Sequence, residues 1–119
     1  MDKFRFLKWR VYQEAKGLLA LILKIVKKLP REYRYELGSQ IIRSAFSVIL
    51  NIAEGSGKTS DKELNRFIEI ALGSVNETLA GADVLNGNNL ATDTEFREVY
   101  LKCDSISNQL GGFKKKLQK

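Results

Sequence analysis

The sequence predicts an all-α protein, a single domain over residues 1–119 that folds as an antiparallel up-down four-helix bundle. Three observations predict this class. Apolar residues recur at spacings of three and four along four long segments, no segment alternates with a period of two, and short breaks rich in Pro, Gly or Asn separate the segments. Four amphipathic helices with short connections pack as a bundle whose neighbours run in opposite directions.

The only proline of the chain separates the first two predicted helices. Apolar positions from 11 to 29 share one helical face, and Pro30 ends this helix because it lacks an N–H and disfavours helix at the preceding residue. The second helix is expected over about residues 37–54, closed by the Gly-Ser-Gly run at 55–57.

Two capping boxes mark the starts of the third and fourth helices. In each, a hydroxyl residue precedes a Glu by three positions: Ser60 precedes Glu63, and Thr92 precedes Glu95. The third helix is expected to stop in the Asn- and Gly-rich run at 86–89, which suits caps and turns. The fourth carries apolar residues at spacings of three and four up to Leu117.

The second helix has more apolar surface than a bundle helix needs. Between residues 41 and 53 its apolar positions cover an arc of about 200°, whereas a core-facing stripe needs about 100°. The surplus lies around Phe46, Ile49 and Leu50. It predicts a homo-oligomer in which another subunit covers the arc. The alternative is that this helix is the most buried one of a monomeric bundle.

Polar strips run along the second and third helices. They consist of Arg43, Ser47, Asn51 and Glu54 on the second, and of Arg66, Glu69, Gly73, Glu77 and Ala80 on the third. Gly73 costs about 1 kcal/mol in a helix interior, so we expect another backbone or a ligand to approach it closely. The alternative is that both strips face solvent and that Gly73 has no packing role.

The residue inventory disfavours catalysis, and no enzyme is expected. The chain has no His and one Cys, which removes Ser–His and Cys–His dyads, imidazole metal ligands and thiolate zinc sites. Glu54 and Glu77 are candidate acid/base carboxylates and Ser47 and Ser74 carry hydroxyls, but no activating base accompanies them. No cofactor or metal is expected. Cys103, on the apolar face of the fourth helix, is expected to be a buried structural thiol.

Basic charge is concentrated near the N-terminus. The formal net charge is +6, and residues 1–34 hold ten basic and three acidic side chains, a net of +7. Residues 35–86 have a net of −3 and residues 87–119 a net of +2, so the three parts sum to +6. The candidate basic surface comprises Arg10, Lys16, Lys24, Lys27, Lys28, Arg31 and Arg34, together with a C-terminal cluster of Lys114, Lys115, Lys116 and Lys119.

A phosphate backbone of RNA or DNA is the natural partner of such a surface, bound largely without sequence preference. The aromatic residues Phe4, Phe6 and Tyr12 could add stacking. The alternative is that the lysines only keep the protein in solution. Membrane binding is not expected because the core needs the apolar faces. With no targeting segment in view and a single Cys, a cytoplasmic protein is the expectation.

Several motifs resemble one small bacterial family. They are RSAFSV at 43–48, NIAEG at 51–55, KEL at 62–64 with Phe67, and IALGS at 70–74 with Glu77; Leu7, Trp9 and Pro30 match as well. The chain is similar, over about residues 4–113, to the four-helix bundle family that includes proteins encoded in intervening sequences of large-subunit ribosomal RNA. That family also includes accessory variability determinants of diversity-generating retroelements.

The resemblance implies a homopentameric barrel of bundles with a positively charged surface and no known enzymatic activity. For the accessory members it implies binding of nucleic acid and of a reverse transcriptase during mutagenic cDNA synthesis. The residues it assigns to the family motif or the subunit interface are Arg43, Phe46, Ser47, Ile49, Leu50, Asn51, Glu54, Gly55, Gly73, Ser74 and Glu77. The rival hypothesis is a structural or adaptor oligomer that binds a protein partner without nucleic acid.

Overall fold

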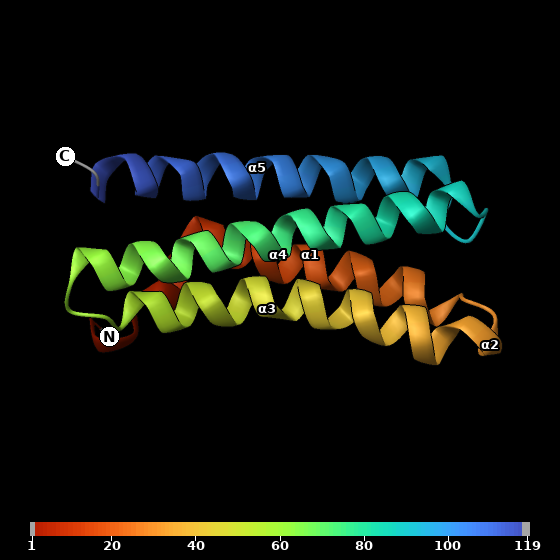
Figure 1. The fold of residues 1–119 in the computed structure, drawn as a ribbon, viewed down its shortest axis with the longest axis horizontal. Helices are drawn as coiled ribbons and strands as arrows, with labels where there is room; N and C mark the ends of the chain where they lie inside the picture. Colours follow the sequence, from red (N-terminus) through yellow and green to blue (C-terminus); the bar gives the residue numbers. More distant parts are fainter. Residues whose placement is uncertain (1, 118–119) are drawn as a thin grey trace.

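A computed structural model describes residues 2–117, and within them the fold has five α-helices and no strand. Four of these helices are long and lie side by side with alternating directions (Figure 1). They are α1 (Arg10–Lys27), α3 (Ser39–Ser56), α4 (Asp61–Gly87) and α5 (Asp93–Leu117). A 3₁₀-helix, η1 (Asp2–Lys8), precedes them, and the short α2 (Arg31–Tyr33) and a π-helix, η2 (Arg34–Gly38), lead into α3.

The four long helices form a closed square. α1 packs against α3 and α5, while α4 packs against the same two helices from the opposite corner. The arrangement is 45 Å long and 24 by 20 Å across. The predicted antiparallel order is therefore observed, and the first and last long helices, α1 and α5, are neighbours.

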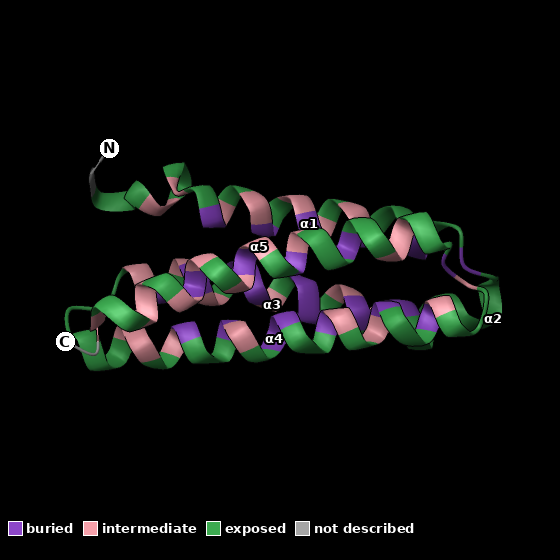
Figure 2. Ribbon diagram, turned by 90° about the horizontal axis from the view of Figure 1, so that it is seen from above, coloured by how far each residue is buried: buried purple, intermediate pink, exposed green. Residues whose placement is uncertain are grey.

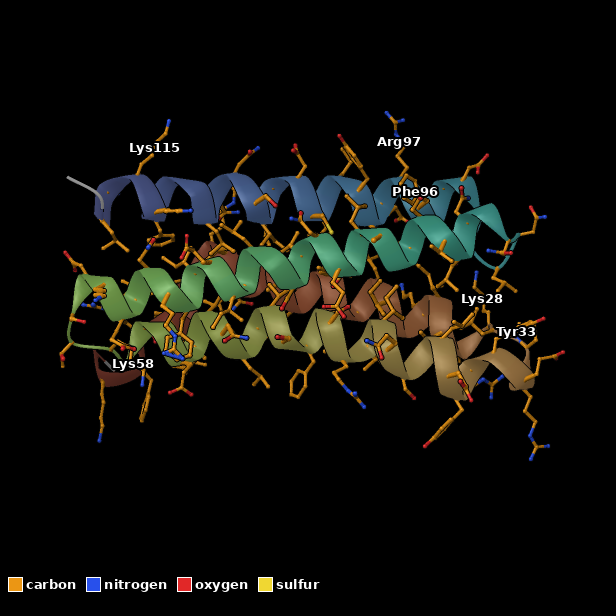
Figure 3. The ribbon with its side chains drawn as sticks, in the orientation of Figure 1. Lys28, Tyr33, Lys58, Phe96, Arg97 and Lys115 are labelled. Carbon is orange, nitrogen blue, oxygen red and sulfur yellow. The ribbon has the colours of Figure 1, made fainter. Side chains whose placement is uncertain are left out.

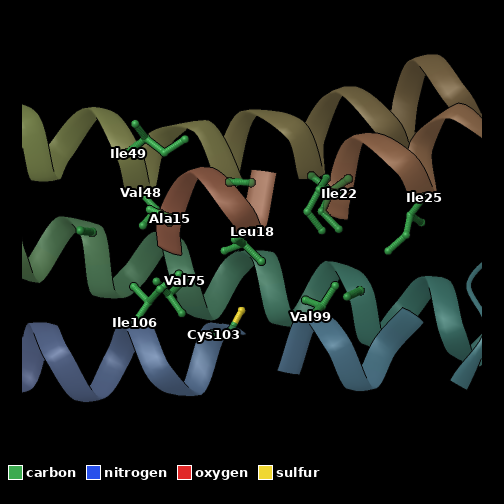
Figure 4. Close-up of a cluster of buried hydrophobic side chains, with 14 of the residues drawn as sticks. Ala15, Leu18, Ile22, Ile25, Val48, Ile49, Val75, Val99, Cys103 and Ile106 are labelled. Atoms are coloured by element: carbon green, nitrogen blue, oxygen red, sulfur yellow. The ribbon is translucent and has the colours of Figure 1, made fainter. Parts of the chain in front are cut away.

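One apolar core runs along the middle of the square. The α1 face predicted from the sequence is buried, including Leu18, Ile22 and Ile25, whereas the outward faces of all four helices are exposed (Figure 2). Burying one such Leu or Ile side chain stabilises the fold by about 1.5–3 kcal/mol. Cys103 points into the same core (Figure 4), and burial raises the pKa of its thiol to about 12. The prediction of a structural thiol is confirmed.

Both predicted helix starts are capped as expected. The Glu63 backbone N–H donates to Ser60 Oγ over 3.1 Å at the start of α4. Before α5 the capping box closes in both directions, because Glu95 N–H donates to Thr92 Oγ1 over 3.1 Å and Thr92 N–H donates to Glu95 Oε1 over 2.9 Å. Each hydroxyl cap satisfies a backbone donor that would otherwise lack a partner.

The prediction for the segment after Pro30 needs correction. Helical structure resumes directly at α2 and widens into the π-helix, so the segment before residue 37 is no open loop. Gly38 at its end is buried against α1, and a Cβ there would lie 2.7 Å from Val26 Cγ1. At the other end, Gly55 and Ser56 belong to α3 and Gly57 caps it.

Replacing Gly38 by Ala should lower the free energy of unfolding by about 1–3 kcal/mol, because the added methyl group overlaps Val26. Gly73→Ala is the matched control. Nothing lies within 4 Å of a Cβ built there, so this change should raise the free energy of unfolding by up to about 1 kcal/mol. Urea denaturation followed by circular dichroism compares the two variants. Equal stabilities would contradict the close α1–α3 approach.

Candidate nucleic-acid interface

The outward face of α1 carries a row of exposed lysines. Lys16, Lys24 and Lys27 lie opposite the buried stripe of this helix. Within the described residues 2–117, none of the three forms an ion pair with a carboxylate, and the Lys16 ammonium lies 5.2 Å from the centroid of the Tyr12 ring. The row extends about 16 Å along the axis at 1.5 Å per residue. These lysines, the α1 lysine row, are available to an anionic partner.

Three other predicted basic residues are bound to carboxylates. Arg10 Nε lies 2.8 Å from Glu14 Oε2 one turn along α1, and Lys114 Nζ lies 2.9 Å from Glu69 Oε2 on α4. Lys28 forms an ion pair with Glu95, which ties the end of α1 to the start of α5. The positive charge of these three is thus partly neutralised within the chain.

The ion pair with Lys28 affects the pKa of the Glu95 carboxyl group. Partial burial raises its pKa, but hydrogen bonds from Lys28 and from the Thr92 backbone N–H outweigh burial, and the pKa is lowered overall. The pKa of Glu14 is lowered as well, mainly by a hydrogen bond from Ser105, with burial opposing it and Arg10 adding to the lowering. Both carboxylates therefore stay ionised at neutral pH.

The first predicted basic cluster runs along the whole of α1, so Arg10 lies at the same end of the molecule as the C-terminal lysines, where Trp9 and Phe113 pack with ring centroids 5.5 Å apart (Figure 1). Lys28 sits against the first turn of α5, and Lys115 lies in the last turn, about 30 Å further along that helix (Figure 3). Arg97, Glu98, Lys102 and Asp104 lie on α5 between them, two basic and two acidic residues. Lys116 is exposed beside Lys115, and Lys119 falls outside the described residues. The C-terminal lysines therefore lie beside the start of α1 and far from its Lys28 end.

The predicted stacking residues differ in availability. Phe6 and Tyr12 pack edge to face on one another, with ring centroids 5.1 Å apart. Phe4 is exposed and lies 5.6 Å from the Lys3 ammonium. Of the three aromatic residues, Phe4 alone is exposed, and Phe6 and Tyr12 are partly buried.

Arg31 and Arg34 lie at the turn after α1. Arg31 is exposed, and Arg34 donates from Nη2 to the Leu29 carbonyl over 3.0 Å, which holds its guanidinium at the corner. Two exposed tyrosines, Tyr33 and Tyr35, belong to the same turn. The helical spacings do not single out these tyrosines; the signal is their alternation with arginines in the run Arg-Glu-Tyr-Arg-Tyr at 31–35.

Several motif residues hold α3 against α4. Ser74 Oγ donates to Ser47 Oγ over 2.9 Å, and Asn51 Nδ2 donates to the Ser47 carbonyl and hydroxyl over 2.8 and 3.0 Å. Gly55 is buried, and a Cβ there would lie 3.0 Å from Phe67 Cβ. Ser47 and Asn51 are therefore half buried where α3 contacts α4, and we call this contact the α3–α4 seam. The alternative that both strips face solvent is wrong for these two residues of α3, whereas every member of the α4 strip is exposed, as that alternative has it: Arg66, Glu69, Gly73, Glu77 and Ala80.

The candidate acid/base carboxylates lie at the surface. Glu54 Oε2 is 3.3 Å from Lys58 Nζ, and Glu77 Oε2 accepts a hydrogen bond of 3.3 Å from Gln40. Arg43 is exposed on the same side of α3. Within residues 2–117 no three His, Cys, Asp or Glu side chains come together as a metal-binding group. Glu54 and Glu77 thus contact Lys58 and Gln40 at the protein surface.

The surplus apolar arc of α3 is smaller than predicted. Ile49 is only 6% exposed, because α1 packs on that side of α3 and the Ile49 side chain belongs to the core (Figure 4). Phe46 and Leu50 remain 47% and 49% exposed. Gly73 is exposed too, with open space where a Cβ would be. Within residues 2–117, nothing makes the close approach that this glycine predicts.

Comparisons with known proteins give a family and a fold. The family model for 23S rRNA-intervening sequence proteins matches residues 8–112. No curated protein matches the chain. A crystal structure from Bacteroides thetaiotaomicron VPI-5482, described as a protein with unknown function from the S23 ribosomal protein family, superposes with a TM-score of 0.81. It is 23% identical, and the match covers 88% of this chain and 98% of that one.

Across residues 2–117, no helix combines the length and the apolar character needed to cross a membrane.

Glu95→Gln tests the tie between α1 and α5. The folded pKa of Glu95 is lowered from 4.5, so its carboxylate stabilises the fold above the unfolded pKa, and this contribution disappears as pH falls through the folded pKa. We expect the variant to lose about 0.5–1 kcal/mol of unfolding free energy at pH 7 and nothing in strong acid. Urea titrations across pH measure both values. A loss that persists in strong acid, or that the exposed Glu98→Gln control shares, would contradict the assignment.

Proposed function

Because the chain belongs to the 23S rRNA-intervening sequence protein family, we propose that it is a non-catalytic, oligomeric accessory protein that binds RNA or DNA. The α1 lysine row carries this proposal. Lys16, Lys24 and Lys27 project from one rigid helix, and no carboxylate of the described chain neutralises them. A phosphate backbone would release condensed counterions on meeting such a row, which favours binding at low salt.

The proposed surface covers α1 and the turn that follows it. Arg31 and Arg34 continue the charge beyond Lys27, and residues 1–34 together hold a net charge of +7. The C-terminal lysines lie at the end of the molecule that holds Arg10, where they extend the proposed surface. Backbone contacts of this kind carry no sequence information, so binding is proposed to be largely non-specific.

The non-catalytic part of the proposal is supported by how the motif hydroxyls are used. Ser47 and Ser74 bond to each other in the α3–α4 seam, and Asn51 donates to Ser47. A hydroxyl needs an adjacent base to act as a nucleophile. The side chains bonded to these two serines are a hydroxyl and an amide, which do not act as such a base.

We propose in particular that five subunits assemble as a homopentamer. The number five rests on the motif resemblance, and the exposed apolar surface of α3 and α4 supports self-association. Phe46 and Leu50 lie half exposed on α3. On another side of α3, an apolar groove of about 230 Å³ lies between α3 and α4, lined in part by Leu37 and Val84. Solvent-facing apolar patches of this kind favour association with another protein surface.

The proposed partner is a reverse transcriptase of a diversity-generating retroelement. This partner follows from the resemblance of NIAEG at 51–55 and IALGS at 70–74 to the accessory variability determinants. In that setting the protein would hold nucleic acid during cDNA synthesis. The second candidate function, an adaptor that binds only protein, is favoured by the exposed Tyr100 and Leu101 on the outer face of α5.

Neutralising the α1 lysine row tests the nucleic-acid surface. Lys16→Gln, Lys24→Gln and Lys27→Gln together should reduce the slope of log affinity against log salt by about one for each phosphate that the row neutralises, and weaken binding of all sequences alike. Lys28 is left intact because its ion pair with Glu95 is structural. Fluorescence anisotropy with labelled RNA and DNA measures affinity and slope.

A control of equal charge accompanies that triple variant. Lys62→Gln, Arg66→Gln and Arg97→Gln also lower the net charge from +6 to +3, but they lie on α4 and α5. This control should keep nearly all of the affinity. If both variants bind equally, or if the α1 variant binds like wild type, the proposed surface is wrong.

Leu50→Lys tests the oligomer. Leu50 is 49% exposed, so a lysine there should leave the bundle folded while its charge destabilises a subunit interface on α3. Light scattering should show a multiple of 13.5 kDa for wild type and a lower mass for the variant. Leu101→Lys, on the outer face of α5, is the matched control and should keep the wild-type mass. A monomeric wild type would end the oligomer proposal.

A further inference from the structure

Two tyrosines protrude from the corner between α1 and α3. Tyr35 is 80% exposed, the highest value among the exposed large hydrophobic side chains of the described residues, and Tyr33 is 42% exposed. Figure 3 places Tyr33 at the extreme end of the molecule, close to the end of α1 that carries Lys28. Isolated exposed apolar residues are common on proteins, but this one turn carries two exposed aromatic rings, at helical positions i and i+2 that face different sides of it.

The backbone at this corner is fixed on both sides. Pro30 precedes α2, and Arg34 Nη2 donates to the Leu29 carbonyl over 3.0 Å. Gly38 closes the π-helix against Val26, where there is no room for a Cβ. Single turns of π-helix occur mostly inside helices and frequently at functional sites. The tyrosines are therefore carried on an anchored turn, so their rings are presented with little loss of backbone freedom on binding.

Positive charge surrounds the rings. Lys27, Arg31 and Arg34 are exposed within this stretch, and residues 24–36 hold five basic and two acidic side chains, a net of +3. The two acidic residues are Glu32 and Glu36, both exposed. Lys28 is already paired with Glu95. The uncommitted cations can meet phosphates while the tyrosine rings remain free.

We propose that this Arg–Tyr corner, made of Arg31, Tyr33, Arg34 and Tyr35, is a stacking site for single-stranded nucleic acid. It rests on the proposed function and deepens it by naming the strand state. Unpaired bases stack on aromatic rings while basic groups follow the backbone, a combination that tolerates any sequence. A duplex keeps its base faces inside the helix and reaches only the cations. The corner therefore adds a preference for single strands to the non-specific attraction of the α1 lysine row.

The test uses Tyr33→Leu with Tyr35→Leu, which keeps apolar bulk but removes the rings. The probes are a short labelled single-stranded RNA, the same sequence as DNA, the RNA duplex, and an abasic strand with the same number of phosphates. We expect affinity for the single strands to fall about 5- to 100-fold. Affinity for the duplex and the abasic strand should stay unchanged, and so should the salt slope, because every cation that meets a phosphate is retained.

Two control variants isolate stacking. Tyr33→Phe with Tyr35→Phe keeps the rings and should bind single strands like wild type. Tyr100→Leu removes a comparably exposed ring on α5 and should have no effect. Thermal unfolding should be alike for all variants because these rings are exposed.

The outcomes separate this inference from the proposed function. If wild type binds no nucleic acid, both are overturned. If it binds and the double Leu variant is unchanged, or weakens equally on the abasic strand, the stacking site is wrong while the lysine row stands. A double Leu variant that lowers the molar mass without changing affinity would assign the tyrosines to a protein interface and overturn the stacking site.

Discussion

The close approach of α3 and α4 is the constraint on which the rest of the fold depends. Ser44 and Thr78 share a buried hydrogen bond of 2.8 Å between their hydroxyls, and at Gly81 a Cβ would lie only 3.0 Å from Ile41 Cδ1. Small or hydrogen-bonded side chains let the two backbones come together. Leaving one buried hydroxyl unpaired would cost about 1–3 kcal/mol. α1 and α5 then pack across the core from this pair.

This constraint decides where function can lie. The seam uses Ser47, Asn51 and Ser74 as structural contacts, so a large part of the family motif describes packing. Among the charged residues that packing leaves exposed, Lys16, Lys24 and Lys27 lie on the outer face of α1, and Arg31 and Arg34 lie at the turn after it. A bundle with a row of exposed lysines on one helix presents the surface that the proposed binding of an extended anion needs. The apolar surface left on α3, at Phe46 and Leu50, is the place at which the proposed self-association would occur.

Much of this could be predicted because it is local. Apolar spacing indicated the buried face of α1, and hydroxyl–Glu pairs indicated both helix starts. Features that depend on contacts between different helices were either not predicted or predicted wrongly. Ile49 is buried because of the direction from which α1 approaches, and Ser47 is half-buried because Ser74 faces it. The π-helix depends on Gly38 meeting Val26, a contact that no spacing in the sequence specifies.

The most direct test is binding of labelled single-stranded RNA, duplex RNA and duplex DNA over a series of salt concentrations. Light scattering of the same samples gives the molar mass. We expect binding at low salt that weakens steeply as salt rises, with a slope that counts the phosphates contacted, by a protein larger than a monomer. Absence of binding even at roughly 50 mM salt, where such contacts are strongest, would contradict a nucleic-acid surface and leave the protein adaptor as the better description.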